Sequence, residues 1–159
     1  MNKTFLLLGS NIGDSLAQLN SAIHHIGQNT GKLLTRSGMY ITAAWGNTQQ
    51  PDFLNQVIVI ETAFTAEQTL QSILAIEKMM GRVRTVKNAP RIIDIDILFF
   101  NDEIIQQNDL VIPHPEIQNR RFVLIPLNEL APELEHPVLG KTVHQLLAEC
   151  PDPLVVKKF

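Results

Sequence analysis

Apolar residues along this chain fall into short continuous runs and into stripes with a spacing of three or four residues. The runs are rich in Leu, Val and Ile, which is typical of buried β-strands. They predict strands at 4–8, 33–42, 55–62 and 90–99. The stripes predict two amphipathic helices, one beginning at Asp14 or Ser15 and one at Thr65, where Thr65 and Gln68 match a capping box.

The predicted elements follow the order strand, helix, strand, strand, helix, strand, and then a more varied C-terminal part. In that part we expect a short strand at 103–105, a strand at 122–127 and a helix at 142–149. The order of the first six elements is typical of the ferredoxin-like split β-α-β pattern. The sequence therefore predicts an α+β fold with an antiparallel sheet, helices on both faces and a C-terminal extension. No linker or repeat interrupts it, so residues 1–159 are expected to form a single domain.

The composition is typical of a compact protein of a reducing compartment. Hydrophobic residues make up 45% of the 159 residues, which is enough to form a core. The net charge of −3 argues against a nucleic-acid partner. The single cysteine, Cys150, excludes a disulfide framework and a cysteine-based zinc site. The apolar segment 5–8 is too short for a signal peptide or a membrane span, so we expect no membrane partner. From the cysteine usage we expect a cytoplasmic location, and we expect a monomer.

Two carboxylates interrupt the last of the strand-like runs. Asp94 and Asp96 are two residues apart, so in a strand their side chains point to the same face, about 6.5 Å apart along the chain. Like charges on a half-buried strand are costly unless a cation lies between them, and oxygen ligands suit Mg²⁺. The alternative is an exposed edge on which the carboxylates have no role. Ile92, Leu98 and Phe100 are expected on the same face, and such apolar neighbours argue against that alternative.

Arginine residues cluster beside this pair of carboxylates. The segment 78–91 holds Lys78, Arg82, Arg84, Lys87 and Arg91 and no acidic residue. Arg120 and Arg121 form a second basic pair. Arginine next to a metal site suits a polyphosphate ligand, because each guanidinium group can bind two phosphate oxygens. A solvated basic loop is the alternative, and it is more plausible for the two lysines than for the arginines.

Other candidate positions carry less information when each is taken alone. Glu77 lies in the apolar stripe of the second helix, where it either supports the site or forms a structural salt bridge. His114 lies between two prolines, where it either donates to a phosphate or simply forms part of a turn. The loop 43–53 is long for the connection it makes, and such loops are often functional. The sequence contains no P-loop, dinucleotide-binding or protein-kinase motif.

Taken together, the motifs resemble those of one enzyme family. Segment 87–98, which reads Lys-Asn-Ala-Pro-Arg-Ile-Ile-Asp-Ile-Asp-Ile-Leu, is similar to the signature of the 6-hydroxymethyl-7,8-dihydropterin pyrophosphokinases of folate biosynthesis. The other matching motifs are Gly9-Ser10-Asn11, Phe53-Leu54-Asn55, Glu77 with Gly81-Arg82-Val83-Arg84, Pro113-His114-Pro115, and Arg120 with Phe122-Val123-Leu124. The resemblance covers nearly the whole chain. It implies transfer of pyrophosphate from ATP to the hydroxymethyl group of the pterin, with release of AMP.

The resemblance also implies roles for individual residues. Asp94 and Asp96 are implied to hold two Mg²⁺ ions, and Arg82 and Arg91 are the catalytic candidates. The residues implied to bind ATP and its phosphates are Glu77, Arg82, Arg84, Arg91, Ile97, His114 and Arg120. The residues implied to form the pterin site are Thr42, Ala43, Trp45, Phe53, Asn55, Asp94 and Phe122. The two phenylalanine rings are implied to sandwich the pterin, and ordinary core packing is the alternative for both.

Two other functions are compatible with parts of the pattern. A non-catalytic nucleotide-binding module on the same scaffold would also contain a basic cluster, because a fold does not determine a function. Such a module would bind ATP without releasing AMP. A metal-dependent phosphohydrolase would need a base that activates water, and the sequence offers no obvious one. We therefore expect an ATP-dependent pterin pyrophosphokinase.

Overall fold

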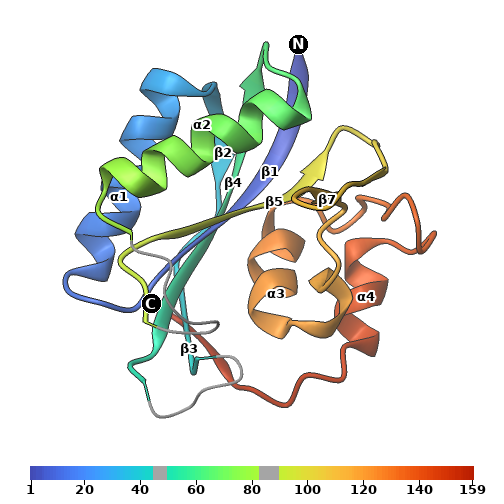
Figure 1. Ribbon diagram of the computed structural model, residues 1–159. Coiled ribbons are helices and arrows are strands. Elements are labelled where there is room, and N and C mark those ends of the chain that lie inside the picture. The colour runs from blue at the N-terminus through green and yellow to red at the C-terminus, as the bar shows by residue number, and fades with distance from the viewer. Residues whose placement is uncertain (45–49, 83–89) are drawn as a thin grey trace.

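The computed structural model describes residues 1–44, 50–82 and 90–159, and Figure 1 shows their arrangement. The strands are β1 (Asn2–Ser10), β2 (Lys32–Arg36), β3 (Tyr40–Thr42), β4 (Phe53–Thr62), β5 (Asp94–Phe100), β6 (Ile105–Gln106), β7 (Val111–Ile112) and β8 (Val156–Lys158). The helices are α1 (Ser15–Asn29), α2 (Ala66–Met79), α3 (Arg121–Leu130) and α4 (Val143–Glu149), with a short 3-10 helix at Ile117–Asn119. Among these helices, none has the length and apolar composition needed to cross a bilayer.

The strands form one antiparallel sheet and a separate hairpin. The sheet has the order β5-β1-β4-β3-β8, and β2 pairs with β4 beside this path. The hairpin consists of β6 and β7. The antiparallel sheet and the order of the first elements confirm the predicted α+β class.

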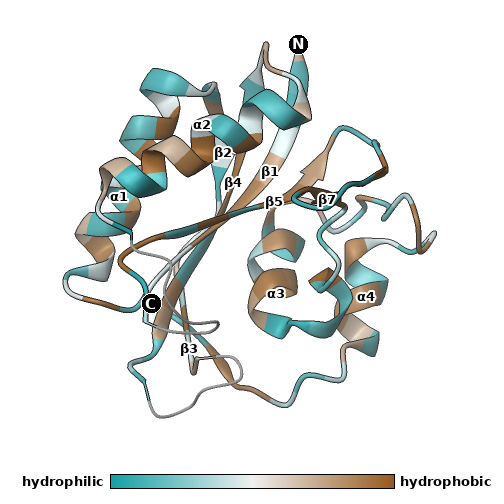
Figure 2. Ribbon diagram, viewed as in Figure 1, coloured by the Kyte–Doolittle hydropathy of each residue, from teal (hydrophilic) through white to brown (hydrophobic). Residues whose placement is uncertain are grey.

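Helices cover both faces of the sheet, as predicted (Figure 1). Side chains of successive strand residues alternate between the faces, so each central strand contributes to two cores. On one face, Leu6 and Ile58 pack with residues of α1 and α2. On the other face, Leu7, Val57 and Leu127 pack together under α3 and α4. Figure 2 shows the corresponding brown apolar residues along the central strands and on the helix surfaces turned toward them.

The starts of α1 and α2 follow the capping signals in the sequence. The Asp14 side chain accepts a hydrogen bond from the backbone N–H of Ala17 at 3.1 Å. At α2, Thr65 and Gln68 exchange the two reciprocal bonds of a capping box. These bonds satisfy N–H groups that have no partner inside the helix, which fixes where each helix begins.

Two predicted strands differ from the observed elements in type or continuity, while those at 90–99 and 103–105 differ from β5 and β6 in their bounds. The segment 122–127 is not a strand but lies inside α3, because a continuous apolar run without periodicity fits a buried helix as well as a buried strand. The predicted strand at 33–42 is divided into β2 and β3. The division occurs at Ser37, whose hydroxyl oxygen accepts from the Val57 N–H at 3.0 Å and donates to the Gly38 carbonyl at 2.6 Å. The side chain therefore replaces a regular ladder bond at that point.

A register shift also changes the faces within β5. Phe5 pairs with Phe99 while the next residue of β1 pairs with Ile97, so Leu98 is an extra residue in β5. As a result Leu98 packs under α3 and α4, whereas Phe100 joins the core under α1 and α2. The prediction that both share the face of the two aspartates is correct for Leu98 and wrong for Phe100. It is also wrong for Ile92, which precedes the strand and packs against the core under α1 and α2.

Candidate active site

The pairing of three strands brings polar residues into one row across the sheet. Asp94 of β5 lies opposite Gly9 of β1, and Gly9 lies opposite Asn55 of β4. The row therefore spans two interstrand spacings, about 10 Å. A Cβ atom at Gly9 would lie 3.2 Å from the Asn55 Oδ1 atom and 3.5 Å from the Phe53 ring. Glycine at this position leaves open the space between the side chains on either side.

A pocket that is partly open to solvent lies over this row, and its empty space, open solvent included, is about 550 Å³. Its lining residues are Leu7, Gly9, Thr42, Ala43, Phe53, Asn55, Arg91, Asp94, Asp96, Arg120 and Phe122. All of these except Leu7 and Gly9 are site residues predicted from the sequence, although they come from three strands or strand ends and from the start of α3. The fold thus brings together residues up to 115 positions apart by number, Leu7 and Phe122, in one concave site.

The pocket combines flat apolar surfaces with positive charge. The Arg91 guanidinium carbon lies 6.0 Å from the centre of the Phe53 ring, and that of Arg120 lies 6.0 Å from the centre of the Phe122 ring. Among the described residues, the buried Asn55 Nδ2 atom has no hydrogen-bond partner. A buried amide donor of this kind is normally satisfied, so it can donate to the polar edge of a bound ring.

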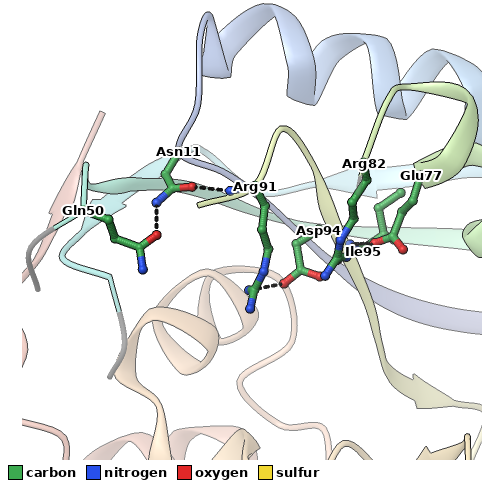
Figure 3. Close-up of polar contacts among 7 residues, drawn as sticks. All are labelled: Asn11, Gln50, Glu77, Arg82, Arg91, Asp94 and Ile95. Carbon is green, nitrogen blue, oxygen red and sulfur yellow. Dashed lines mark hydrogen bonds and ion pairs between the residues drawn. The ribbon is translucent and has the colours of Figure 1, made fainter. Parts of the chain in front are cut away.

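An ion-pair network joins Asp94 of the pocket lining to Arg82 and Glu77 (Figure 3). Arg82 Nη1 contacts Glu77 Oε2 at 2.6 Å and Asp94 Oδ1 at 2.7 Å. The same Glu77 oxygen accepts from the backbone N–H of Ile95 at 2.8 Å. Glu77, which is only 2% exposed, therefore forms the structural salt bridge and at the same time holds the start of β5. Its two proposed roles are both compatible with this geometry.

Arg91 and Asn11 connect the strand ends around the pocket (Figure 3). Arg91 Nη1 contacts Asp94 Oδ2 at 3.0 Å, and the backbone N–H of Arg91 donates to Asn11 Oδ1 at 2.8 Å. The Asn11 amide nitrogen donates to Gln50 Oε1 at 2.7 Å and to the Pro51 carbonyl at 3.0 Å. Asn11 thereby joins the end of β1 to the segments that lead into β4 and β5. The sequence motif Gly9-Ser10-Asn11 marks this position but does not reveal its partners.

Asp96 has an unusual electrostatic environment. Among the described residues, the ion pairs of the site reach Asp94 but not Asp96. Burial, and then the negative charges of Asp94 and Glu77, raise the pKa of Asp96 to about 7. A divalent cation between Asp94 and Asp96 would remove this repulsion. Two carboxylates are oxygen donors that fit a hard cation, which would take its remaining ligands from phosphate oxygens and water. No group of three or more His, Cys, Asp or Glu side chains converges within the described residues.

His114 lies beside the site in a neutral form. Its backbone N–H donates to the Leu98 carbonyl at 3.0 Å, and its Nδ1 atom accepts from the Glu116 N–H at 3.1 Å. Burial, and then the positive charge of Arg120, lower the pKa of His114 to about 4. Because Nδ1 is an acceptor, the ring hydrogen is on Nε2. His114 can therefore donate a hydrogen bond to an anion without carrying a charge.

Several predicted residues are not part of the pocket lining. Ile97 is 7% exposed and belongs to the core under α1 and α2, on the face opposite to Asp96. Arg121 of the predicted basic pair turns toward the C-terminal segment. Trp45 and Arg84 lie outside the described residues.

Sequence comparison places these features in a family. A family model described as 7,8-dihydro-6-hydroxymethylpterin-pyrophosphokinase (HPPK) matches residues 5–132. A 2-amino-4-hydroxy-6-hydroxymethyldihydropteridine pyrophosphokinase of Methylorubrum extorquens is 40% identical over 99% of this chain and 99% of its own length. The folic acid synthesis protein fol1 of Schizosaccharomyces pombe is 39% identical, covering 94% of this chain but 20% of its own.

Comparison with solved structures agrees in fold. The crystal structure of Plasmodium falciparum HPPK-DHPS with SDX-DHP has a TM-score of 0.75 and 22% sequence identity. The match covers 94% of this chain and 43% of that chain. At this identity the likeness concerns the fold alone.

Proposed function

The chain belongs to the 7,8-dihydro-6-hydroxymethylpterin-pyrophosphokinase family, and on this premise we propose that it transfers the pyrophosphoryl group of ATP to 6-hydroxymethyl-7,8-dihydropterin. One observation carries the proposal. The row formed by Asp94, Gly9 and Asn55 joins a carboxylate pair, suited to a metal-bound polyphosphate, to a pocket with two aromatic rings and a buried amide. A site for a nucleotide alone would not need the second half of that arrangement.

In this reaction the hydroxymethyl oxygen of the pterin attacks the β-phosphorus of ATP. The bond between that phosphorus and the oxygen bridging to the α-phosphorus breaks. AMP leaves with the bridging oxygen, and the hydroxyl proton is lost to solvent. Transfer of this kind depends mainly on alignment and on neutralisation of charge, with little covalent participation by the protein.

Asp94 and Asp96 are the proposed ligands of two Mg²⁺ ions. The two oxygens of Asp94 already contact Arg82 and Arg91, so both guanidinium groups lie where a phosphate bound at these carboxylates would meet them. When bound, Mg²⁺ would neutralise phosphate charge and help to align the reacting groups. Arg82 and Arg91 would stabilise the charge that develops on the transferred group, and that role makes them the proposed catalytic residues.

The remaining phosphate contacts come from beside the pocket. Arg120 would supply a further positive charge at the wall formed by the start of α3. His114 would donate a neutral hydrogen bond from Nε2, since its pKa lies near 4. Glu77 would act behind the site, because it holds Arg82 and the backbone of Ile95 rather than the ligand.

The pterin would occupy the other end of the pocket. Phe53 and Phe122 would contact its two faces, and Asn55 would bind its polar edge through an amide that both donates and accepts. Thr42 and Ala43 line the same end. Asn55 is 2% exposed, so hydrogen bonds that it makes to a ligand are shielded from water.

Some expectations stay predictions. The monomeric state, the cytoplasmic location and the single-domain organisation of residues 1–159 are expectations from the sequence alone. The ATP contacts of Arg84 and Ile97 and the pterin contact of Trp45 are implied only by the resemblance to the family.

Product identity tests the proposal. The protein is incubated with Mg²⁺, ATP and 6-hydroxymethyl-7,8-dihydropterin, and the nucleotides are separated by chromatography. We expect AMP and the pyrophosphorylated pterin in equal amounts. A pterin that lacks the hydroxymethyl oxygen is the control and should yield no AMP. Formation of ADP, or binding of ATP by folded protein without turnover, would refute the proposal and favour a nucleotide-binding module.

A further inference from the structure

Arg121 separates two residues of the pocket wall but does not face the pocket itself. Its neighbours Arg120 and Phe122 both line the pocket. The Arg121 side chain instead donates to two backbone carbonyls of the C-terminal segment, from Nε to Asp152 at 3.1 Å and from Nη2 to Cys150 at 3.3 Å. The start of α3 is therefore anchored on the side away from the ligand.

Asp152 caps α3 from a distant part of the chain. The N-cap residue Arg120 makes no capping bond with its own side chain. The Asp152 Oδ2 atom accepts from the backbone N–H of Arg121 at 3.0 Å, and its Oδ1 atom accepts from the Leu154 N–H at 2.9 Å. Asp152 is only 2% exposed. A buried carboxylate at a helix N-terminus satisfies an N–H group and interacts favourably with the helix dipole.

The same C-terminal segment also reaches the opposite wall of the pocket. It continues into β8, which pairs with β3 so that Val156 lies opposite Thr42. The Thr42 hydroxyl donates to the Val155 carbonyl at 3.4 Å. Figure 1 shows this red segment leaving α4, passing beneath α3 and joining the sheet beside β3. We call residues 150–158 the C-terminal strap.

We propose that Asp152 is a positioning residue for substrate binding, which fixes the start of α3, and with it Phe122 and Arg120, relative to the β3 side of the pocket. The strap lies outside residues 5–132, the part that matches the family model. The contact between Asp152 and the N–H of Arg121 is made one residue from each of the two pocket residues. A shift of the start of α3 would therefore move the Phe122 ring, which lines the pocket. The inference rests on the proposed function, because it predicts an effect on pterin binding.

The test compares two variants that each remove a capping acceptor from a helix of the same layer. Asp152→Ala removes the acceptor at α3, and Thr142→Ala removes the one at α4, which does not line the pocket. Both should lower Tm by a few degrees. Calorimetric titration with 6-hydroxymethyl-7,8-dihydropterin should give at least a fivefold higher Kd for Asp152→Ala than for the wild type. The Kd for Mg-ATP should rise less than the Kd for the pterin, because Arg120 is only one of several proposed phosphate contacts. Thr142→Ala should bind both ligands as the wild type does.

Two further variants keep the test decisive if Asp152→Ala does not fold. Asp152→Asn retains one acceptor oxygen, so it should raise the pterin Kd less than alanine does. Arg121→Met removes both side-chain anchors while its backbone N–H can still bond to Asp152, and it should raise the pterin Kd at least twofold. Wild-type affinity in every folded Asp152 and Arg121 variant would overturn the inference, as would an equal loss in Thr142→Ala. If the wild type itself fails to bind the pterin or to form AMP, the proposed function fails instead.

Discussion

Replacement of Asp96 should separate the stability of the protein from its function. Burial, and then the charges of Asp94 and Glu77, raise the pKa of Asp96 from 3.8 to about 7. In the unfolded chain an aspartate keeps its ordinary pKa, so unfolding releases a proton that the folded chain retains. Because of this group, the free energy of unfolding falls as the pH rises from about 4 to about 7, and the contribution is constant above that range.

The pKa difference sets the size of the effect. About 3 pH units at 1.4 kcal/mol each give a cost of about 4 kcal/mol for ionised Asp96 above pH 7. Asn has the shape of Asp but does not ionise, so the stability of Asp96→Asn relative to the wild type should rise by about 2–3 kcal/mol between pH 5 and pH 8. The desolvation cost of the amide is independent of pH and does not alter this difference.

The comparison with the wild type is needed because His114 acts in the opposite direction. Its pKa is lowered from 6.5 to about 4, so the unfolded chain binds a proton that the folded chain does not. Its contribution to stability is therefore lost as the pH falls from about 6.5 to about 4. In the wild type this effect would offset part of that of Asp96, but it cancels between two proteins that both contain His114.

The assay is urea denaturation followed by circular dichroism at pH 5, 6, 7 and 8 in EDTA. Asp109→Asn, a replacement of an exposed aspartate, is the control and should differ from the wild type equally at every pH. With Mg²⁺ and both substrates, Asp96→Asn should form AMP at least about 100-fold more slowly than the wild type. A stability difference that does not change between pH 5 and pH 8 would refute the argument that repulsion between carboxylates prepares the site for a cation.

Three further predictions concern the surroundings of the pocket. Gly9→Ala should weaken pterin binding about tenfold in calorimetry, because its methyl group enters the pocket. The control is Gly27→Ala, where an added Cβ has no atom within 4 Å. It should leave pterin binding unchanged and raise the free energy of unfolding by about 0.5–1 kcal/mol. Glu77→Gln breaks a buried ion pair and should lower the free energy of unfolding by about 3 kcal/mol. Glu67 is exposed in the same helix, and Glu67→Gln should lower it by less than about 0.5 kcal/mol. Equal losses for the two variants in urea denaturation would contradict this prediction. The His114 ring should not titrate in NMR spectra between pH 5.5 and 8, because its pKa is about 4, and a midpoint above 6 would exclude it as a neutral donor.

Local patterns in the sequence are sufficient to predict features that depend on neighbouring residues. The capping box at Thr65 and the start of α1 near Asp14 are confirmed because capping bonds join residues three positions apart. Asp94 and Asp96 line the same pocket because strand side chains alternate with a period of two. The same rule fails beyond the bulge at Leu98, since an extra residue there shifts every later side chain to the other face.

These local patterns do not predict contacts between residues that are far apart in the sequence. Nothing near Arg121 indicates that it turns from the pocket to Asp152, 31 positions later. The sequence predicts that Glu77 and Arg82 lie in the same region. It does not predict that Arg82 contacts both Glu77 and Asp94. Such choices depend on which backbone segments the sheet brings side by side, and strand order and register are properties of the whole chain.

Gly9 illustrates why the site can be understood only from the strand order and register of the whole sheet. Glycine inside a strand loses more conformational entropy on folding than other residues and has no side chain to pack. β1 is a central strand, and its apolar neighbours pack on both faces of the sheet, so packing alone would favour a larger residue at this position. The register explains the exception, because a side chain at Gly9 would project between Asp94 and Asn55, which it faces on the two adjacent strands. Glycine at this position therefore lowers the stability of the fold while it keeps the space between Asp94 and Asn55 open. This loss of stability has a functional explanation if a ligand fills the space.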